Sequence, residues 1–348
     1  MRAVVFREGS RWQVETIDAP TPAPGEALLT IIKTGVCGTD EHLLHGGFIA
    51  KFPLVPGHEM VAEVVALGEG VSEPAVGTQV VVDNTVFCGH CDACRRGTVL
   101  YCSNFVSLGC NAAGGFAEQV VVSAGKLYPI GDLHPDIAVF TEPTACAMHG
   151  VDVLALKPAS DVLIFGAGPT GLILAQLLRM AGAARVTVAA PTASKLALAR
   201  AHGAHHTVRI DRTDAAAGVA ELRAIAPDGF DAVIEATGST SVLEHAVSLT
   251  RTGGTVLVYG LAGEDALAAI KPYEIFSREL TIKGSFAQAN CIGRALFALQ
   301  SGVVSTAGMI TREVSLDDFD QALAGLKDSE QIKTLVSPSL PSREGRAS

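Results

Sequence analysis

The sequence predicts an α/β fold of two domains, in which a partly closed β-barrel precedes a doubly wound parallel sheet. The length of 348 residues, 48% of them hydrophobic, is enough for two cores. Up to about Pro143 the chain is rich in glycine, proline and short β-branched runs, which is typical of an all-β barrel. From Thr144 onward, short apolar strands alternate with alanine-rich helical segments, which indicates parallel βαβ units. The predicted domains are therefore residues 1–143 and 144–284.

Within the first domain, β-branched residues gather in runs that we expect to be barrel strands. The clearest of these runs are residues 26–32, 60–65 and 79–82. They are followed by residues 84–108, where cysteine and glycine interrupt the strand pattern. We expect this segment to form a lobe that projects from the barrel.

Four cysteines in the lobe carry the most specific motif of the chain. Cys88, Cys91, Cys94 and Cys102 have the spacing C-x2-C-x2-C-x7-C. Thiolates bind zinc tetrahedrally, and four of them close the site, so such a zinc is structural. A pair of disulfides would need an oxidising compartment, and an iron–sulfur cluster usually has another spacing. We therefore predict a structural zinc at these four residues.

The second domain contains short apolar strands separated by helical segments. The strands are expected at residues 162–165, 186–188, 232–235, 255–258 and 280–283. Helices are expected at residues 193–202 and 241–249, and beyond the domain at 292–300 and 316–326. Strands that alternate with helices predict a parallel sheet with helices on both faces.

The run Gly-Ala-Gly-Pro-Thr-Gly at residues 166–171 matches the pattern G-x-G-x-x-G. It follows a predicted strand and opens a helix, which is the context in which this pattern binds a dinucleotide. The glycines allow a tight turn and close approach of a pyrophosphate, and the helix N-terminus supplies free N–H groups. The alternative is a tight turn without a ligand. The residues expected at the cofactor are Gly166, Gly168, Pro169, Thr170 and Gly171.

Two further runs are Gly-Val-Cys-Gly-Thr-Asp-Glu-His at residues 35–42 and Pro-Gly-His-Glu at residues 56–59. With the cysteine spacing and the glycine turn, they resemble the zinc-dependent medium-chain dehydrogenase/reductase family, in its branch of sorbitol, arabinitol and sugar dehydrogenases. The resemblance extends to about Ser337. It implies a GroES-like barrel and a Rossmann domain, with residues 285–337 ending the Rossmann domain and returning to the barrel. The polar tail, residues 338–348, is expected to be mobile.

The resemblance implies a catalytic zinc in addition to the structural zinc. Cys37 matches the thiolate ligand of the family and His58 the imidazole ligand. Glu59 matches a neighbouring carboxylate that either binds zinc or lies just behind it. Glu142, followed by Pro143, occupies the place of a fourth group, where polyol dehydrogenases have this Glu-Pro and liver-type alcohol dehydrogenases have a cysteine. Glu142 would bind zinc directly or through a water molecule.

Mixed sulfur, nitrogen and oxygen ligands leave a position on zinc open to substrate. Zinc as a Lewis acid lowers the pKa of an alcohol, and a hydride then passes to nicotinamide. The proton must leave a buried site, so a relay is required. The resemblance implies Thr39 as first acceptor and His42 as exit to solvent, with His45 as a weaker candidate for the exit. Together with Glu59 these are the expected catalytic residues, although His42 could also be an ordinary loop histidine.

Alignment with the family places Ala190 where NAD enzymes carry an acidic residue that binds the ribose 2′-hydroxyl. Without that carboxylate a 2′-phosphate is not repelled. Thr192 and Ser194 can donate hydrogen bonds to such a phosphate, and Lys195 and Arg209 can supply positive charge. We therefore predict NADP over NAD. The alternative is that Ser194 and Lys195 are ordinary residues of a first helical turn.

Other residues are assigned to the cofactor by resemblance alone. Thr237 belongs to a strand end that lies over the adenosine half in the family. Leu261, Ser285 and Phe286 fall where the family places groups near nicotinamide. Turn formation and core packing are the alternatives for these positions.

The leading functional hypothesis is a dehydrogenase that uses zinc and NADP to convert a secondary alcohol, with a polyol or sugar alcohol favoured, reversibly to a ketone. Candidate pocket residues Phe48, Phe87, Leu108 and Phe286 are apolar, which weakens the polyol hypothesis. The alternatives are a reductase of simple ketones, a dehydrogenase of cyclitols or amino alcohols, and a nonenzymatic NADP-binding protein. The last of these would be expected to lack a catalytic ligand, yet Cys37 and His58 are present.

Charge and hydropathy exclude several other classes. A net charge of −10 disfavours a zinc-ribbon nucleic-acid binder and attachment to an anionic membrane. The most apolar stretch, residues 162–178, is broken by glycines and therefore predicts a strand, turn and helix. The polar N-terminus and eight cysteines favour a reduced cytoplasm, with Cys110, Cys146 and Cys291 as small core residues. The resemblance implies a homodimer or homotetramer, with residues 261–270 as a pairing segment.

Overall fold

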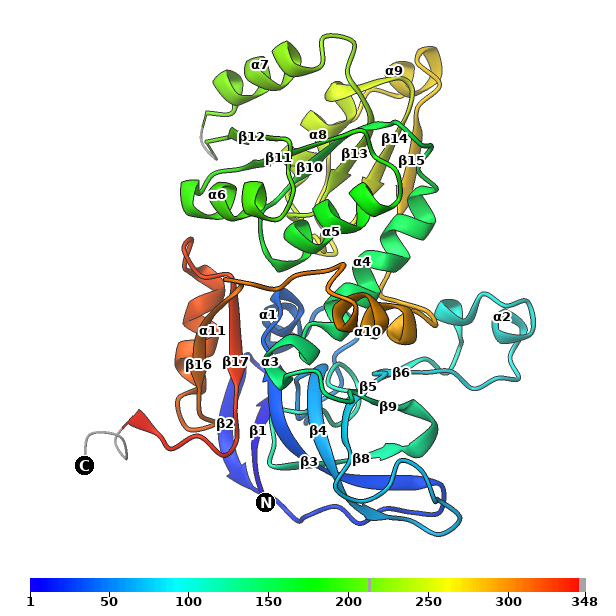
Figure 1. The fold of residues 1–348 in the computed structure, drawn as a ribbon, viewed down its shortest axis with the longest axis vertical. Coiled ribbons are helices and arrows are strands. Elements are labelled where there is room, and N and C mark those ends of the chain that lie inside the picture. The colour runs from blue at the N-terminus through cyan, green and yellow to red at the C-terminus, as the bar shows by residue number, and fades with distance from the viewer. Residues whose placement is uncertain (212–213, 344–348) are drawn as a thin grey trace. The chain divides into compact units, whose positions relative to one another are not determined.

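The computed structural model describes residues 1–211 and 214–343, which divide into two compact units. Unit 1 consists of residues 1–145, 289–302 and the chain from 306 onward, and unit 2 of residues 146–288 and 303–305. Helix α4 (Thr141–Leu154) joins the two units. The domain boundaries expected after residues 143 and 284 remain predictions. Figure 1 shows the order of the elements.

Unit 1 is built on a mostly antiparallel sheet of seven strands. Their order is β16–β17–β3–β4–β5–β9, and β8 also pairs with β3. The strands are β3 (Glu26–Gly35), β4 (Glu59–Leu67), β5 (Gln79–Val82), β8 (Gln119–Ser123), β9 (Leu127–Pro129), β16 (Ile310–Val314) and β17 (Lys333–Val336). The three predicted barrel runs lie in β3, β4 and β5, and their apolar side chains form one buried cluster. The last two strands bring the C-terminal part of the chain into this sheet.

The other elements of unit 1 surround this sheet. Two hairpins are β1 (Arg2–Arg7) with β2 (Arg11–Thr16), and β6 (Thr85–Val86) with β7 (Val106–Ser107). The short helices are α1 (Gly38–Leu44), α2 (Asp92–Arg95), η1 (Val99–Tyr101), η2 (Ala124–Lys126) and α3 (Pro135–Ala138). The two later helices are α10 (Ile292–Gln300) and α11 (Phe319–Lys327). Helix α10 coincides with its prediction.

Helix α11 begins later than the expected residue 316. The reason is a local turn, in which the Ser315 hydroxyl donates to the Asp318 carboxylate at 2.7 Å and accepts from the Asp318 amide at 3.2 Å. Side chains of this kind compete with helical hydrogen bonds and favour the residue before a helix. Asp318 is that residue here. The Asp318 carboxylate also accepts from the Arg343 amide at 3.1 Å, and this hydrogen bond attaches the first part of the expected tail. Residues 344–348 of that tail lie outside the described residues.

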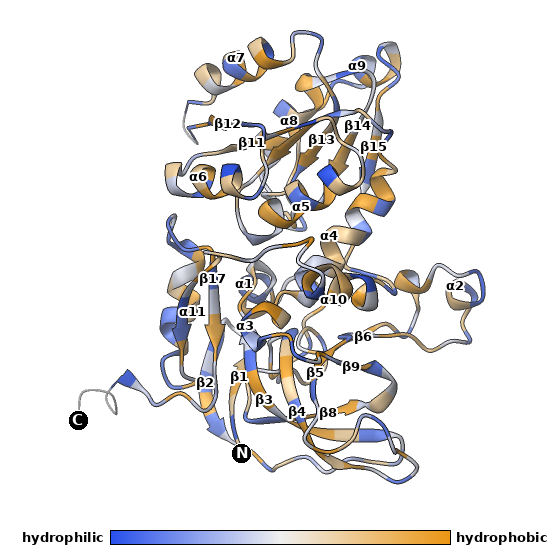
Figure 2. Cartoon of the chain, in the orientation of Figure 1, coloured by the Kyte–Doolittle hydropathy of each residue, from blue (hydrophilic) through white to orange (hydrophobic). Residues whose placement is uncertain are grey.

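Unit 2 is a parallel sheet of six strands in the order β12–β11–β10–β13–β14–β15. The strands are β10 (Asp161–Phe165), β11 (Arg185–Ala190), β12 (His206–Arg209), β13 (Phe230–Glu235), β14 (Thr250–Val258) and β15 (Thr281–Gly284). The helices are α5 (Pro169–Met180), α6 (Ala193–Ala201), α7 (Ala216–Ile225), α8 (Thr240–Leu249) and α9 (Pro272–Ser277). If the six strands are numbered from 1 to 6 along the chain, their order in the sheet is 3-2-1-4-5-6. This is the doubly wound Rossmann arrangement. Hydrophobic residues are concentrated along these strands in Figure 2.

The position of a ligand site in unit 2 follows from this order. Strands β10 and β13 are neighbours, yet the chain proceeds from them toward opposite edges of the sheet. At such a switch point the loops after the strands separate and leave a crevice at the carboxyl ends. The glycine turn at residues 166–171 follows β10 directly and therefore lies there.

Candidate metal centres and nucleotide site

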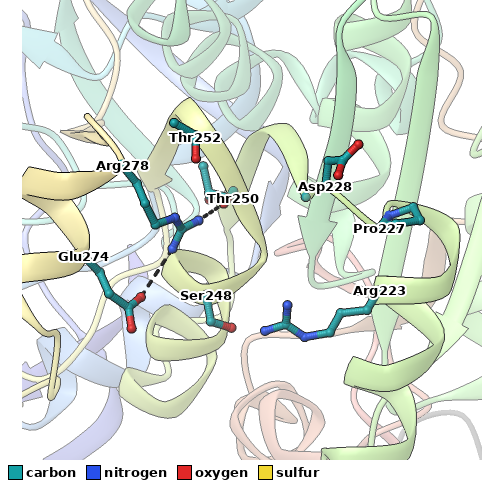
Figure 3. Close-up of a pocket in the computed structure, with 9 residues that line it drawn as sticks. Arg223, Pro227, Asp228, Ser248, Thr250, Thr252, Glu274 and Arg278 are labelled. Atoms are coloured by element: carbon teal, nitrogen blue, oxygen red, sulfur yellow. Dashed lines mark hydrogen bonds and ion pairs between the residues drawn. The ribbon is translucent and has the colours of Figure 1, made fainter.

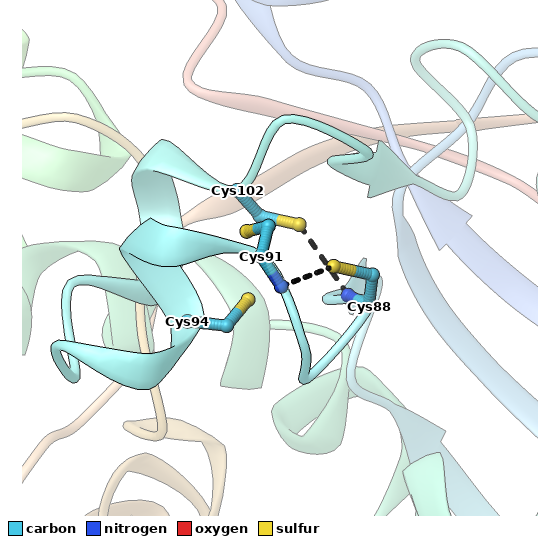
Figure 4. Close-up of side chains that lie close together, drawn as sticks. All are labelled: Cys88, Cys91, Cys94 and Cys102. Carbon is cyan, nitrogen blue, oxygen red and sulfur yellow. Dashed lines mark hydrogen bonds between the residues drawn. The ribbon is translucent and has the colours of Figure 1, made fainter.

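The four lobe cysteines converge as the sequence predicts. The hairpin of β6 and β7 forms the base of the lobe, Cys91 precedes α2 and Cys94 lies within it. Their sulfur atoms all lie within 4.8 Å of one another, and Figure 4 shows them turned toward a common centre. None of the eight cysteines, which all fall in the described part of the chain, is in a disulfide.

Backbone amides of the lobe point at these sulfur atoms. The Cys88 amide donates to Cys102 Sγ at 3.3 Å, the Asn104 amide to the same sulfur at 3.4 Å, and the Cys91 amide to Cys88 Sγ at 3.4 Å. The amides of His90 and Cys91 lower the pKa of the Cys88 thiol to about 5. Donors that favour the thiolate are what a metal ligand of this type needs. The donor set therefore fits a closed structural zinc.

The base of the lobe is held by a charged residue that has no part in the cysteine cluster. Lys126 Nζ pairs with Asp83 Oδ2 at 2.8 Å and lies 5.2 Å from the centre of the Phe87 ring. Phe87 in turn stacks on Phe105 with ring centres 5.9 Å apart. The apolar character of Phe87 is thus accounted for by packing in the lobe.

A second cluster lies in unit 1 where β3 ends and β4 begins. Ligand atoms of Cys37, His58 and Glu59 lie within 4.8 Å of one another, and His58 and Glu59 are buried. Strand pairing explains why these three residues lie together, because Gly35, two residues before Cys37, is the register partner of Glu59. A side chain at Gly35 would lie 1.9 Å from Glu59 Oε2, so only glycine leaves room for this carboxylate. Sulfur, nitrogen and oxygen donors in one buried place fit a catalytic zinc.

Asp40, which the sequence analysis did not single out, connects two members of this cluster. Its Oδ2 accepts from the Cys37 amide at 2.9 Å, while its Oδ1 lies 3.6 Å from His58 Nδ1. Neither Oδ1 nor Nδ1 has a hydrogen-bond partner, although both are buried. Burial raises the pKa of Asp40 to about 6. A proton on Nδ1 directed at Asp40 would leave Nε2 as the metal ligand.

Lys333 is the second residue that the sequence analysis missed. Its ammonium donates to Glu59 Oε1 at 2.8 Å and to Oε2 at 2.7 Å, and both side chains are almost fully buried. Burial alone would lower the pKa of Lys333, but the Glu59 carboxylate raises it above its usual value. The pair is therefore a buried salt bridge next to the predicted metal ligands.

Of the other residues predicted for this centre, Thr39 lies near Cys37, whereas Glu142 is outside the donor cluster. Thr39 Oγ1 lies 3.6 Å from Cys37 Sγ, and His42 follows three residues later on the same helix, α1. Glu142 lies in the first turn of α4 and acts electrostatically on Lys333, but its carboxylate is not in the cluster of Cys37, His58 and Glu59. Direct ligation by Glu142 therefore remains a prediction.

His45 lies apart from the metal cluster of unit 1, whereas Cys110 lies next to it. His45 is exposed, and its Nδ1 lies 2.8 Å from Ser10 Oγ. Cys110 is buried in a core cluster, as expected, but also contacts His58. Burial lowers the pKa of His58, whereas Cys110 and Asp40 raise it, and the net direction is upward.

The glycine turn in unit 2 has the geometry of a phosphate cradle. Gly166 has φ of 115°, a conformation that favours glycine. A side chain at Gly171 would meet the Gly166 carbonyl oxygen at 2.0 Å, whereas a side chain at Gly168 would meet no atom within 4 Å. Gly168 immediately precedes α5, whose first turn contains Pro169 and Thr170. Open space in front of a helix N-terminus fits a pyrophosphate.

The residues predicted to select NADP lie at the ends of two neighbouring strands. Ala190, at the end of β11, is buried and is the register partner of Arg209, at the end of β12. Arg209 is exposed, and its Nε donates to the Pro191 carbonyl oxygen at 3.2 Å. Thr192 precedes α6, and its hydroxyl does not cap the helix. Ser194 and Lys195 lie in the first turn of α6.

The other predicted cofactor residues follow the remaining strands. Thr237 follows β13, and its amide donates to the Glu235 carboxylate at 2.6 Å. Leu261 lies beyond β14, and its carbonyl oxygen is close to Gly238. Ser285 follows β15, and its buried hydroxyl has no hydrogen-bond partner, so its role at the cofactor remains a prediction. Phe286 is 36% exposed. All these residues belong to the carboxyl ends of the strands.

A cleft of about 460 Å³ lies elsewhere in unit 2. It is lined by residues before β13 and at the start of β14, at the amino ends of the strands, and Figure 3 shows Arg223 and Arg278 on opposite sides of it. Arg278 is bound to Glu274 at 3.3 Å and to backbone oxygens. This cleft and the glycine turn lie at opposite ends of the sheet.

The doubly wound unit and the two donor clusters define a zinc-type, nucleotide-dependent dehydrogenase. The family model of the alcohol dehydrogenase GroES-like domain matches residues 23–132. The family model of the zinc-binding dehydrogenases matches residues 169–301. The chain belongs to this family of zinc-binding alcohol dehydrogenases, which confirms the predicted class and fold. Among residues 1–211 and 214–343, no helix is long and apolar enough to cross a membrane.

Individual relatives are similar over nearly the whole chain. D-arabinitol dehydrogenase 1 of Uromyces fabae is 41% identical over 339 residues, which cover 97% of this chain and 97% of that protein. D-altritol 5-dehydrogenase of Agrobacterium fabrum is 34% identical, covering 92% of this chain and 94% of that protein. A zinc-binding dehydrogenase of Sinorhizobium meliloti, solved with NADP bound, has a TM-score of 0.90 and 34% identity, with 97% and 99% of the two chains covered.

Proposed function

We propose that this protein is a zinc- and NADP-dependent dehydrogenase that interconverts a polyol, or a closely related secondary alcohol, and its ketone. The observation that carries the proposal is the convergent donor set of Cys37, His58 and Glu59, in which Cys37 is half-buried and the other two side chains are buried. A nonenzymatic NADP-binding protein would not need these three donors in one place. Similarity to arabinitol and altritol dehydrogenases over most of the chain favours a polyol.

Cys37 and His58 would hold the catalytic zinc, with Glu59 or Glu142 as the nearby carboxylate. When bound, the zinc would polarise the oxygen of the substrate as a Lewis acid. Asp40 would orient the His58 ring through Nδ1, and its contact with the Cys37 amide would hold the start of α1. The four lobe cysteines would hold a second zinc with a structural role only.

Oxidation moves a hydride from the alcohol carbon to nicotinamide C4 and releases the hydroxyl proton. Thr39 is the acceptor that we propose, because its hydroxyl lies 3.6 Å from Cys37 Sγ. His42 is three residues further along α1, on the same face of the helix, and is half-buried. An imidazole can both accept and donate a proton, so His42 can pass the proton to solvent.

The nucleotide would lie across the carboxyl ends of the unit 2 strands, with its pyrophosphate at the glycine turn. We propose NADP because Ala190 carries no charge and the Arg209 side chain comes from the adjacent strand position. The Arg209–Pro191 contact holds this guanidinium near the end of β11, where Thr192, Ser194 and Lys195 add donors. NADP in the Sinorhizobium meliloti relative is consistent with this choice.

The proposed assembly is a homo-oligomer formed through unit 2. Strand β15 is an edge of the sheet, and large apolar side chains nearby are exposed, with Leu267 89%, Tyr273 75% and Phe276 80% exposed. Edge strands and apolar patches of this kind are usually covered by a partner. The expected pairing segment, residues 261–270, contains no strand, so β15 is the better candidate. A cytoplasmic location remains part of the proposal.

The test is a spectrophotometric assay of nicotinamide reduction, with NADP and NAD, against polyols, sugars, amino alcohols and simple secondary alcohols. Metal content is measured on the same sample. We expect two zinc ions per chain and turnover with NADP and a polyol that ends when a chelator removes the metal. Turnover of simple alcohols only would contradict the polyol assignment. A Cys37→Ser variant that keeps both zinc ions and full activity would contradict the catalytic centre.

A further inference from the structure

The cleft of unit 2 has a polar lining that the proposed reaction does not use. It lies at the amino ends of the parallel strands, whereas a dinucleotide lies at the carboxyl ends. Its volume is about 460 Å³. Sites for small molecules commonly have volumes of roughly 300–1,000 Å³. The cleft is therefore large enough for a ligand other than the nucleotide.

Arg223 supplies this cleft with a guanidinium group that the protein itself does not use. It lies in the last turn of α7 and is exposed. Within residues 1–211 and 214–343 it forms no hydrogen bond and no ion pair. Figure 3 shows its side chain extended toward Ser248, across the cleft from Arg278. All the N–H donors of Arg223 are therefore available to a ligand.

Arg278 is held in place on the other side of the cleft. Its guanidinium donates to the carbonyl oxygens of Val247, at 3.3 Å, and Thr250, at the C-terminal end of α8. It also pairs with Glu274 at 3.3 Å. These contacts leave two of the five N–H groups of the guanidinium unused. Because Arg278 is fixed before binding, little side-chain entropy is lost when a ligand binds to it.

The hydroxyl groups of the lining differ in what they can offer a ligand. Ser248 donates to the His245 carbonyl oxygen at 2.9 Å and Thr250 to that of Ala246 at 2.8 Å, so both can only accept from a ligand. The Thr252 hydroxyl is exposed and has no partner in the part of the chain that the structure describes. Thr252 can therefore donate to a ligand.

The two carboxylates of the lining leave Arg223 unpaired. Glu274 is the partner of Arg278. Asp228 has no ion pair among the described residues, and in Figure 3 its carboxylate is turned away from both guanidinium groups. Asp228 is thus an acceptor for the hydroxyl groups of a ligand, and the two guanidinium groups remain open to an anion.

We propose that this cleft binds a small organic phosphate, with the phosphate group between Arg223 and Arg278. Arginine presents paired N–H donors that match phosphate oxygens, and Thr252 would donate to the same group. Ser248 and Asp228 would accept from hydroxyl groups of the ligand. A sugar phosphate or polyol phosphate has both features, so this is the chemical class that matches the lining. The inference does not depend on the proposed catalytic centre.

The experiment is a calorimetric titration of the full chain with sorbitol 6-phosphate, inorganic phosphate and free sorbitol. NADPH is present at saturation, so that the glycine turn is occupied and the alcohol cannot be oxidised. We expect one sorbitol 6-phosphate per chain, bound more tightly than inorganic phosphate. Its affinity should fall as the salt concentration rises, because the contact is between charges.

Two variants test the lining, and a third is the control. Arg223→Gln should weaken binding of sorbitol 6-phosphate by about 10- to 100-fold, and Thr252→Val by about 5-fold. Arg200→Gln removes another exposed arginine of unit 2, one that bonds Thr207 and does not line the cleft. It should leave the affinity unchanged. Any binding of free sorbitol should be the same in all three variants and the wild type.

Three results would overturn the inference. The first is no binding of sorbitol 6-phosphate by the wild type in the presence of NADPH. The second is equal affinity in Arg223→Gln and the wild type, which would place the ligand elsewhere. The third is equal affinity for inorganic phosphate and sorbitol 6-phosphate, which would leave the hydroxyl groups without a role. Because none of these results involves turnover or metal content, they leave the proposed function untouched.

Discussion

Asp40 Oδ1 lies 3.6 Å from His58 Nδ1, and neither buried atom has a hydrogen-bond partner. The other oxygen of Asp40 accepts from the Cys37 amide. One carboxylate therefore contacts both a predicted thiolate ligand and a predicted imidazole ligand. A proton on His58 Nδ1 would face this carboxylate and leave Nε2 for a metal.

Asp40→Asn should weaken the catalytic metal site while leaving the fold intact. The amide oxygen can still accept from the Cys37 amide, but the amide nitrogen then faces His58 Nδ1 and favours the proton on Nε2. We expect affinity for the catalytic zinc to fall by about 10- to 100-fold. Zinc content after dialysis against a weak chelator measures this. Retention of two zinc ions with wild-type affinity would show that Asp40 does not orient His58.

Arg209→Ala should reduce the preference for NADP. The guanidinium lies at the register position of Ala190, so it would contact a 2′-phosphate but not a 2′-hydroxyl. A hydrogen bond to a charged group contributes about 1.5–3 kcal/mol, so kcat/KM with NADP should fall about 10- to 100-fold. The value with NAD should change little. Equal losses with both nucleotides would show that Arg209 has only a structural role.

Ala190→Asp is the complementary change at the same strand ends. A carboxylate there repels a 2′-phosphate and can accept from a 2′-hydroxyl, so the ratio of kcat/KM for NADP over NAD should fall. Arg200→Ala is a suitable control, because Arg200 bonds Thr207 away from these strand ends. An unaltered ratio in Ala190→Asp would contradict the alignment that placed Ala190 at the acidic position.

The fold and most of the candidate site could be predicted because their signals are local in sequence. The lobe cysteines fall within residues 88–102, and the glycine turn within residues 166–171. Strand and helix alternation then predicted the doubly wound sheet. Cys37 and His58 were found through short motifs, and the pairing of β3 with β4 explains their proximity.

Lys333 and Asp40 could not be found in this way, for different reasons. Lys333 is 274 residues from Glu59, and only the pairing of β17 with β3 brings them together. Nothing in the sequence around Lys333 distinguishes it from a surface lysine. Asp40 occupies the third position of a helix, where an acidic residue commonly caps the N-terminus. The placement of Arg209 beside Ala190 follows only from the strand register.

Two glycines of the nucleotide turn should respond differently to alanine. Gly171→Ala places a methyl group 2.0 Å from the Gly166 carbonyl oxygen and should lower the free energy of unfolding by about 1–3 kcal/mol. Gly168→Ala meets no protein atom, so stability should be kept while affinity for NADP falls. Denaturant unfolding and nucleotide titration of both variants measure the two effects. Normal nucleotide affinity in Gly168→Ala would place the pyrophosphate elsewhere.

Cys94→Ser should remove the lobe zinc without affecting unit 2. Three thiols and a hydroxyl bind zinc more weakly than four thiolates, and folding of a small metal lobe is coupled to its metal. We expect one zinc per chain, rapid hydrogen exchange in residues 88–102 and unchanged affinity for NADP. Cys146→Ser, outside both clusters, should retain two zinc ions. Two zinc ions in Cys94→Ser would contradict the ligand assignment.

Phe276→Glu should convert the proposed oligomer to a smaller species. This side chain is 80% exposed in α9, and strand β15 follows it directly at the edge of the sheet. A charge placed in an apolar interface must be desolvated without a partner, which opposes association. Sedimentation analysis measures the mass against 35.9 kDa for one chain. Met180→Glu is the control, because Met180 is 57% exposed on α5, away from this edge. A wild-type mass of one chain, or an unchanged assembly in Phe276→Glu, would show that the patch around β15 is not the interface.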